Sequence, residues 1–311
     1  MLGALTATVA VLFFSINDVA IKFLSGGYAL HQVVLFRSLI GLCFLAAIIA
    51  PFAGGFRVLH TKRLGMHMLR GLCVVFANMT FFLGLAAMPL AEAVAIFFVS
   101  PLVITVFSVV FLGETVGPRR WVAVTVGLLG VIVMLRPGTQ AFQLASLLPL
   151  AAAFGYAALH MLTRKIGTTE TAATMSFYIQ LMFVLVCLVM GLFFGGGQFA
   201  DQSDPSLAFL FRAWVWPDPA DYAVLVLIGA SSAIGGFCIS QAYRASEAAL
   251  VAPFEYLAMP LSILWGIMVF GEWPDFISYC GIALILGSGL YMIWREWRVG
   301  AQLVDSPKAR R

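Results

Sequence analysis

The sequence predicts an all-α integral membrane protein with ten transmembrane helices, arranged as two five-helix repeats of inverted topology. Three observations lead to this fold class: the composition, the recurrence of apolar stretches of bilayer length, and a likeness between the two halves of the chain. Of the 311 residues, 62% are hydrophobic and 10% are charged, whereas a soluble domain is about 45 to 50% apolar and about 25% charged. A water-soluble fold cannot bury that much apolar surface, so the excess must face lipid.

Apolar stretches of spanning length recur along the chain with short polar breaks, since a spanning helix needs about 17 to 25 residues. In the first half they predict helices near 3–24, 31–52, 68–88, 92–112 and 121–136. In the second half they predict helices near 144–163, 172–195, 220–243, 249–270 and 277–295. No basic segment precedes the first stretch, which contains Asn17, Asp18 and Lys22. It is therefore expected to be a retained helix rather than a signal peptide.

The longest break, residues 196–219, has two interpretations. It reads GGGQFADQSDP followed by SLAFLFRAWVWP, whose apolar part is too short to span a bilayer and is rich in aromatic residues. Such a segment can lie along the outer interface, with Trp214 and Trp216 at headgroup level. A disordered loop is the alternative.

The basic residues indicate the orientation. With a cytoplasmic N-terminus, the outer loops hold Arg136 and Arg212, while Lys22 and Arg37 lie within helices. The other Lys and Arg residues then fall in cytoplasmic loops and the tail: Arg57, Lys62, Arg63, Arg70, Arg119, Arg120, Arg164, Lys165, Arg244, Arg295, Arg298, Lys308, Arg310 and Arg311. The positive-inside rule places both termini in the cytoplasm. Because the net charge of +4 is dispersed in this way, no nucleic-acid partner is expected.

The two halves resemble each other in sequence. The first half contains GLAAMPLAEAVAIFFVSP, which ends at Pro101, and then Gly113-Glu114 before a Gly-rich helix. The second half contains YRASEAALVAPFEYLAMP, which ends at Pro260, and then Gly271-Glu272 before another Gly-containing helix. Because each half has five helices, an odd number, the two copies must face opposite ways across the membrane.

The loop charges support the inversion independently. The break after the first Gly-Glu pair carries Arg119 and Arg120, whereas the matching break carries Asp275 and no basic residue. Likewise, the basic stretch at 56–70 corresponds to the acidic outer loop at 196–221. Loop charges of opposite sign on matching copies indicate an inverted repeat. The predicted division is a first repeat at 3–138, a second repeat at 144–296 and a basic cytoplasmic tail at 297–311.

These features, together with the stretch ETVGPRRWVAVTVGLLGVIVMLRPG, resemble the EamA families of the drug/metabolite transporter superfamily over residues 3–296. The resemblance implies a secondary carrier in the inner membrane, working by alternating access, and not an enzyme. The motifs NDVAIK, LFR, LRGL and APFEY are similar to those of members called S-adenosylmethionine uptake transporters. Similar motifs occur in riboflavin transporters and in unassigned bacterial members. The implied substrate is a small polar or zwitterionic organic metabolite, with S-adenosylmethionine, riboflavin, amino acids and drug-like metabolites as alternatives.

Seven side chains form the candidate substrate-binding or coupling site. A charged group near the bilayer centre costs about 2.5 to 3.5 kcal/mol and therefore needs a partner, a watery cavity or a function. The polar residues selected on this ground, and for their place beside the charged ones, are Asn17, Asp18, Lys22, Arg37, His160, Glu255 and Tyr256.

Asp18 and Lys22 are four residues apart on the first helix, so they share a face and can pair. Either Asp18 contacts a cationic substrate or takes a proton, or the pair is structural and Lys22 extends to the outer interface. Asn17 adjoins Asp18 and is a candidate cavity contact. Arg37 stays charged and needs an anionic partner, for which Asp18 and Glu255 are candidates. It is expected either to clamp two helices together or to contact the substrate.

Glu255 lies between Pro253 and Pro260, prolines that interrupt the ninth helix and leave backbone carbonyls free. Interrupted helices at membrane depth are where transporters place their sites. The alternative is a kink, with Glu255 reaching the cytoplasmic interface. Tyr256 is a candidate stacking or hydroxyl contact. His160 occupies the sixth helix near the position of Asp18 in the first, and either relays a proton or is a neutral residue bonded to a neighbouring helix.

A membrane-embedded enzyme acting on lipid-linked substrates is the competing class. It needs a compact set of acid, base or metal ligands, and the sequence has no HExxH, GxSxG or CxxC motif. No catalytic residue, metal ligand or cofactor is therefore expected. The partners expected are a small-molecule substrate and the lipid bilayer. Coupling is either to protons, through Asp18, Glu255 or His160, or by exchange of solutes.

Overall fold

The computed structural model describes residues 2–49, 55, 60–113, 117–138, 143–166, 170–245 and 254–304, and every structural statement below concerns these residues. They form helices, with no β-strand in these ranges. Within them, nine helices are long and apolar enough to cross a membrane, and a shorter apolar helix covers Ala258–Phe270. The predicted all-α membrane fold is confirmed.

The helices of the first half follow the predicted spans closely. They are α1 (Leu2–Leu24), α2 (Leu30–Phe44) with its π-helical continuation η1 (Leu45–Ile49), α4 (Leu64–Ala87), α5 (Leu90–Phe97), α6 (Ser100–Leu112) and α7 (Pro118–Leu135). The fourth span, predicted as one helix, is divided into α5 and α6. Residues 50–54, at the end of the second predicted span, lie outside the described residues.

The second half shows the same agreement. Its elements are η3 (Leu144–Ser146), α8 (Leu147–Ile166), α9 (Ala172–Phe194), α10 (Pro205–Phe211), η4 (Pro219–Asp221), α11 (Tyr222–Ala245), α13 (Ala258–Trp265), η5 (Gly266–Phe270) and α14 (Phe276–Val304). The start of the predicted span at 249–270 lies outside the described residues. Helix α14 continues to Val304, into the predicted tail.

The fourth and ninth spans are broken in similar ways. Phe98 and Val99 separate α5 from α6, and Pro101 follows as the second residue of α6. Because proline has no N–H and its ring collides with the preceding turn, an uninterrupted helix cannot pass through it without distortion. In the ninth span a turn at Tyr256 and Leu257 precedes α13, whose third residue is a proline.

Each of these spans ends on a glycine in the left-handed conformation. Gly113 and Gly271 both have φ +66°, a region that glycine enters without the steric cost of a Cβ. The glycines of the two Gly-Glu pairs are therefore helix stops, and in the second pair Glu272 follows directly after the helix. Glu114 itself lies outside the described residues.

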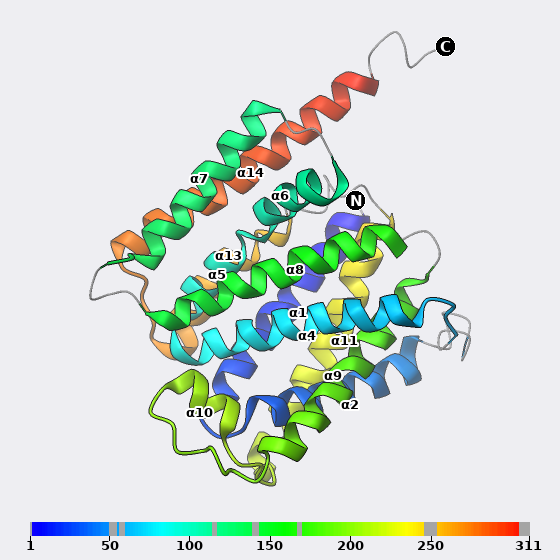
Figure 1. Ribbon diagram of the computed structural model, residues 1–311, viewed down its shortest axis with the longest axis vertical. Helices are drawn as coiled ribbons and strands as arrows, with labels where there is room; N and C mark the ends of the chain where they lie inside the picture. Colours follow the sequence, from blue (N-terminus) through cyan, green and yellow to red (C-terminus); the bar gives the residue numbers. More distant parts are fainter. Residues whose placement is uncertain are drawn as a thin grey trace.

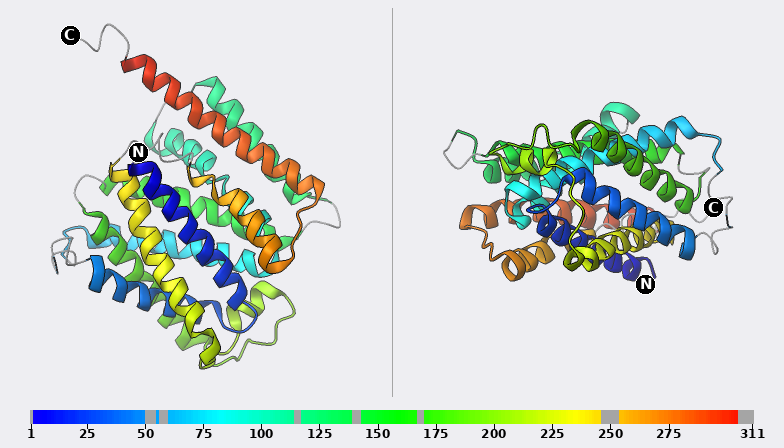
Figure 2. Two further views of the ribbon diagram at one scale, coloured as in Figure 1. Left: turned by 180° about the vertical axis from the view of Figure 1, so that it is seen from behind. Right: turned by 90° about the horizontal axis from the view of Figure 1, so that it is seen from below.

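Helices of one half pack mainly against helices of the other (Figures 1 and 2). Helix α1 packs against α11, α4 against α8, α2 against α9 and α11, and α5 against α13. Helices α7 and α14 lie side by side at one edge of the molecule in both figures. A continuous cluster of buried apolar side chains joins the two halves, while large apolar side chains such as Leu192 and Phe193 are exposed on the outside, as lipid contact requires.

Residues 196–221, the cap segment, are folded over the ends of α1, α2 and α4. The Ser206 hydroxyl donates to the Leu83 carbonyl at 2.8 Å, and the Arg212 guanidinium donates to the carbonyls of Ser25 and Tyr28 at 2.7 and 3.1 Å. Phe209 is fully buried. The alternative of a disordered loop was therefore wrong, because backbone carbonyls at the helix ends provide partners that a local sequence pattern does not reveal.

The two tryptophans of the cap segment separate. Trp214 is half-buried and packs over Gly191 and Gly195, where no side chain is in its way, and its ring lies 5.6 Å from that of His31. Trp216 is 83% exposed. Only Trp216 thus has the exposure expected of an interfacial residue, whereas Trp214 holds the segment to α9.

Candidate functional site

Lys22 lies at the end of α1 and pairs with the second half of the chain. Its Nζ is 2.7 Å from Oε1 of Glu272 and donates to the Met88 carbonyl at 2.6 Å. It also lies 5.1 Å from the centre of the Phe270 ring. The described residues show no ion pair between Lys22 and Asp18, although the two share a helix face. Glu272 is the partner instead, because it follows the helix stop at Gly271 and lies beside the end of α1.

Glu272 is a site residue that sequence reasoning missed. Its Oε2 accepts a hydrogen bond from the backbone N–H of Leu90 at 2.9 Å, so each carboxylate oxygen has a partner in the first half of the chain. The N–H of Leu90 is one of the unpaired donors of the first turn of α5, where a carboxylate is favourable. The repeated Gly-Glu pair was the signal, but it indicated the repeat rather than a contact.

A second polar cluster lies near the same end of the molecule. The Arg136 guanidinium donates to Asp275, and Asp275 also accepts from the backbone N–H of Ser278 at 2.8 Å. The Ser278 hydroxyl donates to Glu92 at 2.6 Å. The hydrogen bond from Arg136 lowers the pKa of Asp275 below its usual range. The cluster connects α5 and α7 of the first half with α14 of the second.

Asp18, Asn17 and Arg37 form the polar group within the first half. The Asn17 amide donates to Asp18 at 3.3 Å, and Asp18 and Arg37 are close enough to interact electrostatically. Asp18 is thus near Arg37 without an ion pair between them among the described residues, and its role as the partner of Arg37 stays a prediction. Arg37 and Asn17 are each 3% exposed. Among the described residues, Nε of Arg37 and Oδ1 of Asn17 have no hydrogen-bond partner.

The guanidinium of Arg37 is held by aromatic rings. It lies 4.6 Å from the centre of the Phe183 ring and 5.3 Å from that of Phe82. Its Nη1 donates to the Asn78 side chain at 3.4 Å. Arg37 therefore contacts side chains of α4 and α9 from its place in α2, and its Nε is an unused donor. Its role as a clamp or a substrate contact stays a prediction.

Glu255, Tyr256 and His160 gather around Tyr156 of α8. Glu255 is half-buried and interacts electrostatically with Tyr156 and Tyr256. His160 packs against Tyr156 in a T-shaped arrangement with ring centres 4.5 Å apart. Tyr256 is 4% exposed, and its hydroxyl has no hydrogen-bond partner among the described residues. Three residues predicted from different arguments are thus brought into one neighbourhood.

A chain of aromatic contacts links the two polar groups. Phe82 contacts Phe81, and Phe81 contacts Phe97 with ring centres 5.1 Å apart. Phe97 contacts Tyr156 at 5.3 Å, and through Phe98 the chain reaches Tyr256. Except for Tyr256, sequence reasoning missed these rings because, in a chain with 27 phenylalanines, an aromatic residue in a spanning helix is unremarkable.

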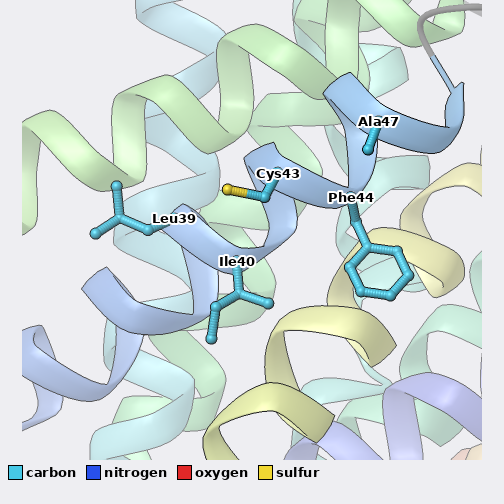
Figure 3. A pocket seen from close by; sticks show the side chains of 5 residues that line it. All are labelled: Leu39, Ile40, Cys43, Phe44 and Ala47. Carbon is cyan, nitrogen blue, oxygen red and sulfur yellow. The ribbon is translucent and has the colours of Figure 1, made fainter.

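An apolar groove on the surface of α2 and η1 lies apart from this group. Figure 3 shows its lining residues, Leu39, Ile40, Cys43, Phe44 and Ala47. None of the seven candidate residues is among them. The groove offers no charged side chain and, in the Cys43 thiol, only a weak hydrogen-bonding group, so a polar solute would lose its hydration there with little compensation.

The fold and the site define a class: a many-helix membrane protein with few intramembrane charges, as in solute transporters. A family model, the EamA-like transporter family, matches residues 1–136. A riboflavin transporter of Vibrio cholerae is 30% identical over 290 residues, covering 91% of this chain and 90% of that protein. The S-adenosylmethionine uptake transporter of Rickettsia prowazekii is 28% identical over 284 residues, covering 91% of this chain and 89% of that protein.

A solved crystal structure shares the fold, with a TM-score of 0.64 and 19% sequence identity, covering 98% of this chain and 99% of that one. The chain belongs to the EamA-like transporter family. It is a membrane transporter of small metabolites.

Proposed function

We propose that the protein is a secondary carrier with ten spanning helices in two inverted repeats, 3–138 and 144–296, which rock to open a central site alternately to each side. The helix contacts support this arrangement. In the proposed repeat, the first span (α1) corresponds to the sixth (α8), and the third (α4) corresponds to the eighth (α11). The packing of α1 against α11 therefore has a counterpart in the packing of α8 against α4, and both are present. The pairs α2 with α9 and α7 with α14 each join a helix to its own counterpart.

The orientation we propose has both termini in the cytoplasm and the protein in the inner membrane. The two basic residues assigned to outer loops, Arg136 and Arg212, are each used in local contacts, with Asp275 and with the carbonyls of Ser25 and Tyr28. They therefore have structural reasons to be there despite the positive-inside rule. In this orientation the end of the molecule that contains Lys22 and Glu272 is the outer end.

We propose S-adenosylmethionine as the substrate. This solute combines a flat adenine ring with a sulfonium cation, an ammonium and a carboxylate. The observation that supports it is the aromatic chain that connects Arg37 with Glu255. Arg37 suits a carboxylate, Asp18 and Glu255 suit cations, and the rings suit both adenine and a cation. The names of the relatives point in the same direction.

A riboflavin carrier is the second candidate, because the same rings suit a flat isoalloxazine and relatives carry that name. An exporter of amino acids or drug-like metabolites is a further alternative. Riboflavin is neutral, so it gives no role to the charges of Arg37, Asp18 and Glu255. Coupling to protons through Asp18, Glu255 or His160, or exchange of one solute for another, would drive the transport.

The test is uptake of labelled S-adenosylmethionine into proteoliposomes, beside a thermal-shift series with S-adenosylmethionine, riboflavin, adenosine and methionine. A ligand at a hundred times its Kd stabilises the folded state by about 2.7 kcal/mol, which raises the melting temperature measurably. Glu255→Gln should abolish uptake while the protein remains monodisperse, and Glu92→Gln, whose carboxylate accepts from Ser278, should retain it. Stabilisation by riboflavin alone would favour the second candidate. Uptake unchanged by Glu255→Gln at every pH would exclude Glu255 from the site.

A further inference from the structure

We propose that Lys22, Glu272 and the backbone N–H of Leu90 form a latch that holds one end of the transporter shut, and that this latch opens in each transport cycle. This inference rests on the proposed alternating-access function. It adds a gating role to Lys22, which the sequence suggested as a substrate or proton contact, and to Glu272, which the sequence did not single out as a site residue.

The latch joins three segments that are distant in sequence. Lys22 lies in the last turn of α1, Leu90 is the first residue of α5, and Glu272 follows η5 in the other half of the chain. Both oxygens of Glu272 are engaged, one by Lys22 at 2.7 Å and one by Leu90 at 2.9 Å. The three segments cannot separate at this end without breaking both contacts of Glu272, so the latch is intact only when this end of the molecule is closed.

The contacts of the latch are favourable when fully formed and costly when only partly broken, so they favour two states, closed and open. The side chains of Lys22 and Glu272 are 10% and 26% exposed, so both charges are largely withdrawn from water. A charge-assisted pair of this kind is favourable while intact, and removal of one partner leaves the other charge buried and unpaired. The open state is accessible only when water can rehydrate both groups together, which happens when the segments part.

The backbone around Glu272 is suited to such a movement. The segment before it, η5, is π-helical, and Gly271 has a left-handed φ of +66°. The N–H of Glu272 donates to the carbonyl of Gly266 at 3.0 Å, which fixes the turn in the closed form. π-Helical segments are frequent at functional sites, where one extra residue loosens the helical ladder.

The latch also lies where a gate is needed. Lys22 is one helical turn beyond Asp18 on the same face of α1, so it stands between Asp18 and the end of the helix. Met88, whose carbonyl accepts from Lys22 at 2.6 Å, connects α4 to α5 on the same side. Closure here separates the polar group of Asp18 and Arg37 from this end of the molecule.

The Arg136–Asp275 pair provides a matched control. It too connects the two halves, but Asp275 is 52% exposed, and the helices it joins, α7 and α14, pack against each other along their lengths. Breaking this pair leaves that packing intact. It is therefore expected to brace the helices rather than to gate the solute path.

The experiment is hydrogen–deuterium exchange of the purified, solute-free protein, which needs neither a known substrate nor transport. Glu272→Gln and Lys22→Met should speed exchange in the peptides covering 88–97 and 266–275 by about tenfold, the factor given by about 1.4 kcal/mol. Asp275→Asn leaves the hydrogen bond from the Ser278 hydroxyl to Glu92 in place and should therefore leave the 88–97 peptide unchanged. The double change Lys22→Glu plus Glu272→Lys should restore much of the protection lost in either single change.

Unchanged exchange in these peptides, in variants that remain monodisperse, would overturn the latch and leave the transport proposal standing. If Glu272→Gln fails to fold, Glu272→Asp, which keeps the charge and shortens the reach, carries the same prediction. Conversely, faster exchange in a protein that moves none of the four test solutes would support the latch and count against the proposed substrates.

Discussion

Tyr256 and Gly289 are packed so closely that a Cβ placed on residue 289 would lie 1.9 Å from the Tyr256 hydroxyl oxygen. Tyr256 belongs to the break in the ninth span and Gly289 to α14, so the glycine makes room for a candidate site residue. We expect Gly289→Ala to displace the Tyr256 ring, to destabilise the protein by about 1 to 3 kcal/mol as overpacking does, and to lower transport.

Two further variants serve as controls for this prediction. Gly287 is in the same helix, and a Cβ there would meet nothing within 4 Å, so Gly287→Ala should leave the melting temperature the same or slightly higher. Combining Gly289→Ala with Tyr256→Phe removes the colliding oxygen and should recover part of the lost stability. Equal melting temperatures for Gly287→Ala and Gly289→Ala would contradict the packing argument.

Arg37 tests whether the planar guanidinium, and not only its charge, is needed. Arg37→Lys keeps the charge but loses the flat contact with Phe82 and Phe183 and the reach to Asn78. We expect a melting temperature several degrees lower and a KM for S-adenosylmethionine raised about tenfold or more, since 1.4 kcal/mol corresponds to a factor of ten. The measurement is initial uptake rate against concentration.

Asn78→Ala is the comparison for Arg37→Lys. The Asn78 contact is long, at 3.4 Å, so its loss should raise KM far less than Arg37→Lys does. If Arg37→Lys behaves like the unmodified protein in both KM and melting temperature, Arg37 is neither clamp nor substrate contact. If only the melting temperature falls, Arg37 holds the helices together and does not contact the substrate.

Asp275 predicts a specific dependence of stability on pH. Because the hydrogen bond from Arg136 lowers its pKa, the folded state holds this carboxylate ionised more strongly than the unfolded state does. The contribution of ionised Asp275 to the stability of the folded state is therefore fully present above the pKa of an unfolded Asp, about 3.9, and is lost as the pH falls through the lower pKa of the folded state. Melting curves of the unmodified protein and Asp275→Asn should differ at pH 7 and converge below about pH 4. A difference that grows on acidification would refute this account.

The spans could be predicted from the sequence because bilayer thickness fixes their length. The division of the fourth span into α5 and α6 was not predicted, although Pro101 lies next to it. The partner of Lys22 could not be predicted, since Glu272 is distant in sequence and reaches Lys22 only through packing of the two halves. The sequence pointed to Asp18 as the partner of Lys22 because helical periodicity relates only residues that are close together in sequence. Tyr156 and Phe97 were missed for a related reason, because nothing local distinguishes a ring that faces a site from one that faces lipid.

The inverted repeat makes one last prediction, which rests on sequence alone, because the side chains concerned lie outside the described ones. Lys22 follows Asp18 by four residues, as Arg164 follows His160, and Glu272 follows a Gly as Glu114 does. If the halves are inverted copies, Arg164 and Glu114 are the counterparts of the Lys22–Glu272 pair. We expect Arg164→Glu and Glu114→Arg each to impair transport and the double change to restore part of it, because reversing both charges keeps their attraction. Strictly additive losses in proteoliposome uptake would mean that the two residues do not interact, and that the symmetry of the halves does not extend to these charges.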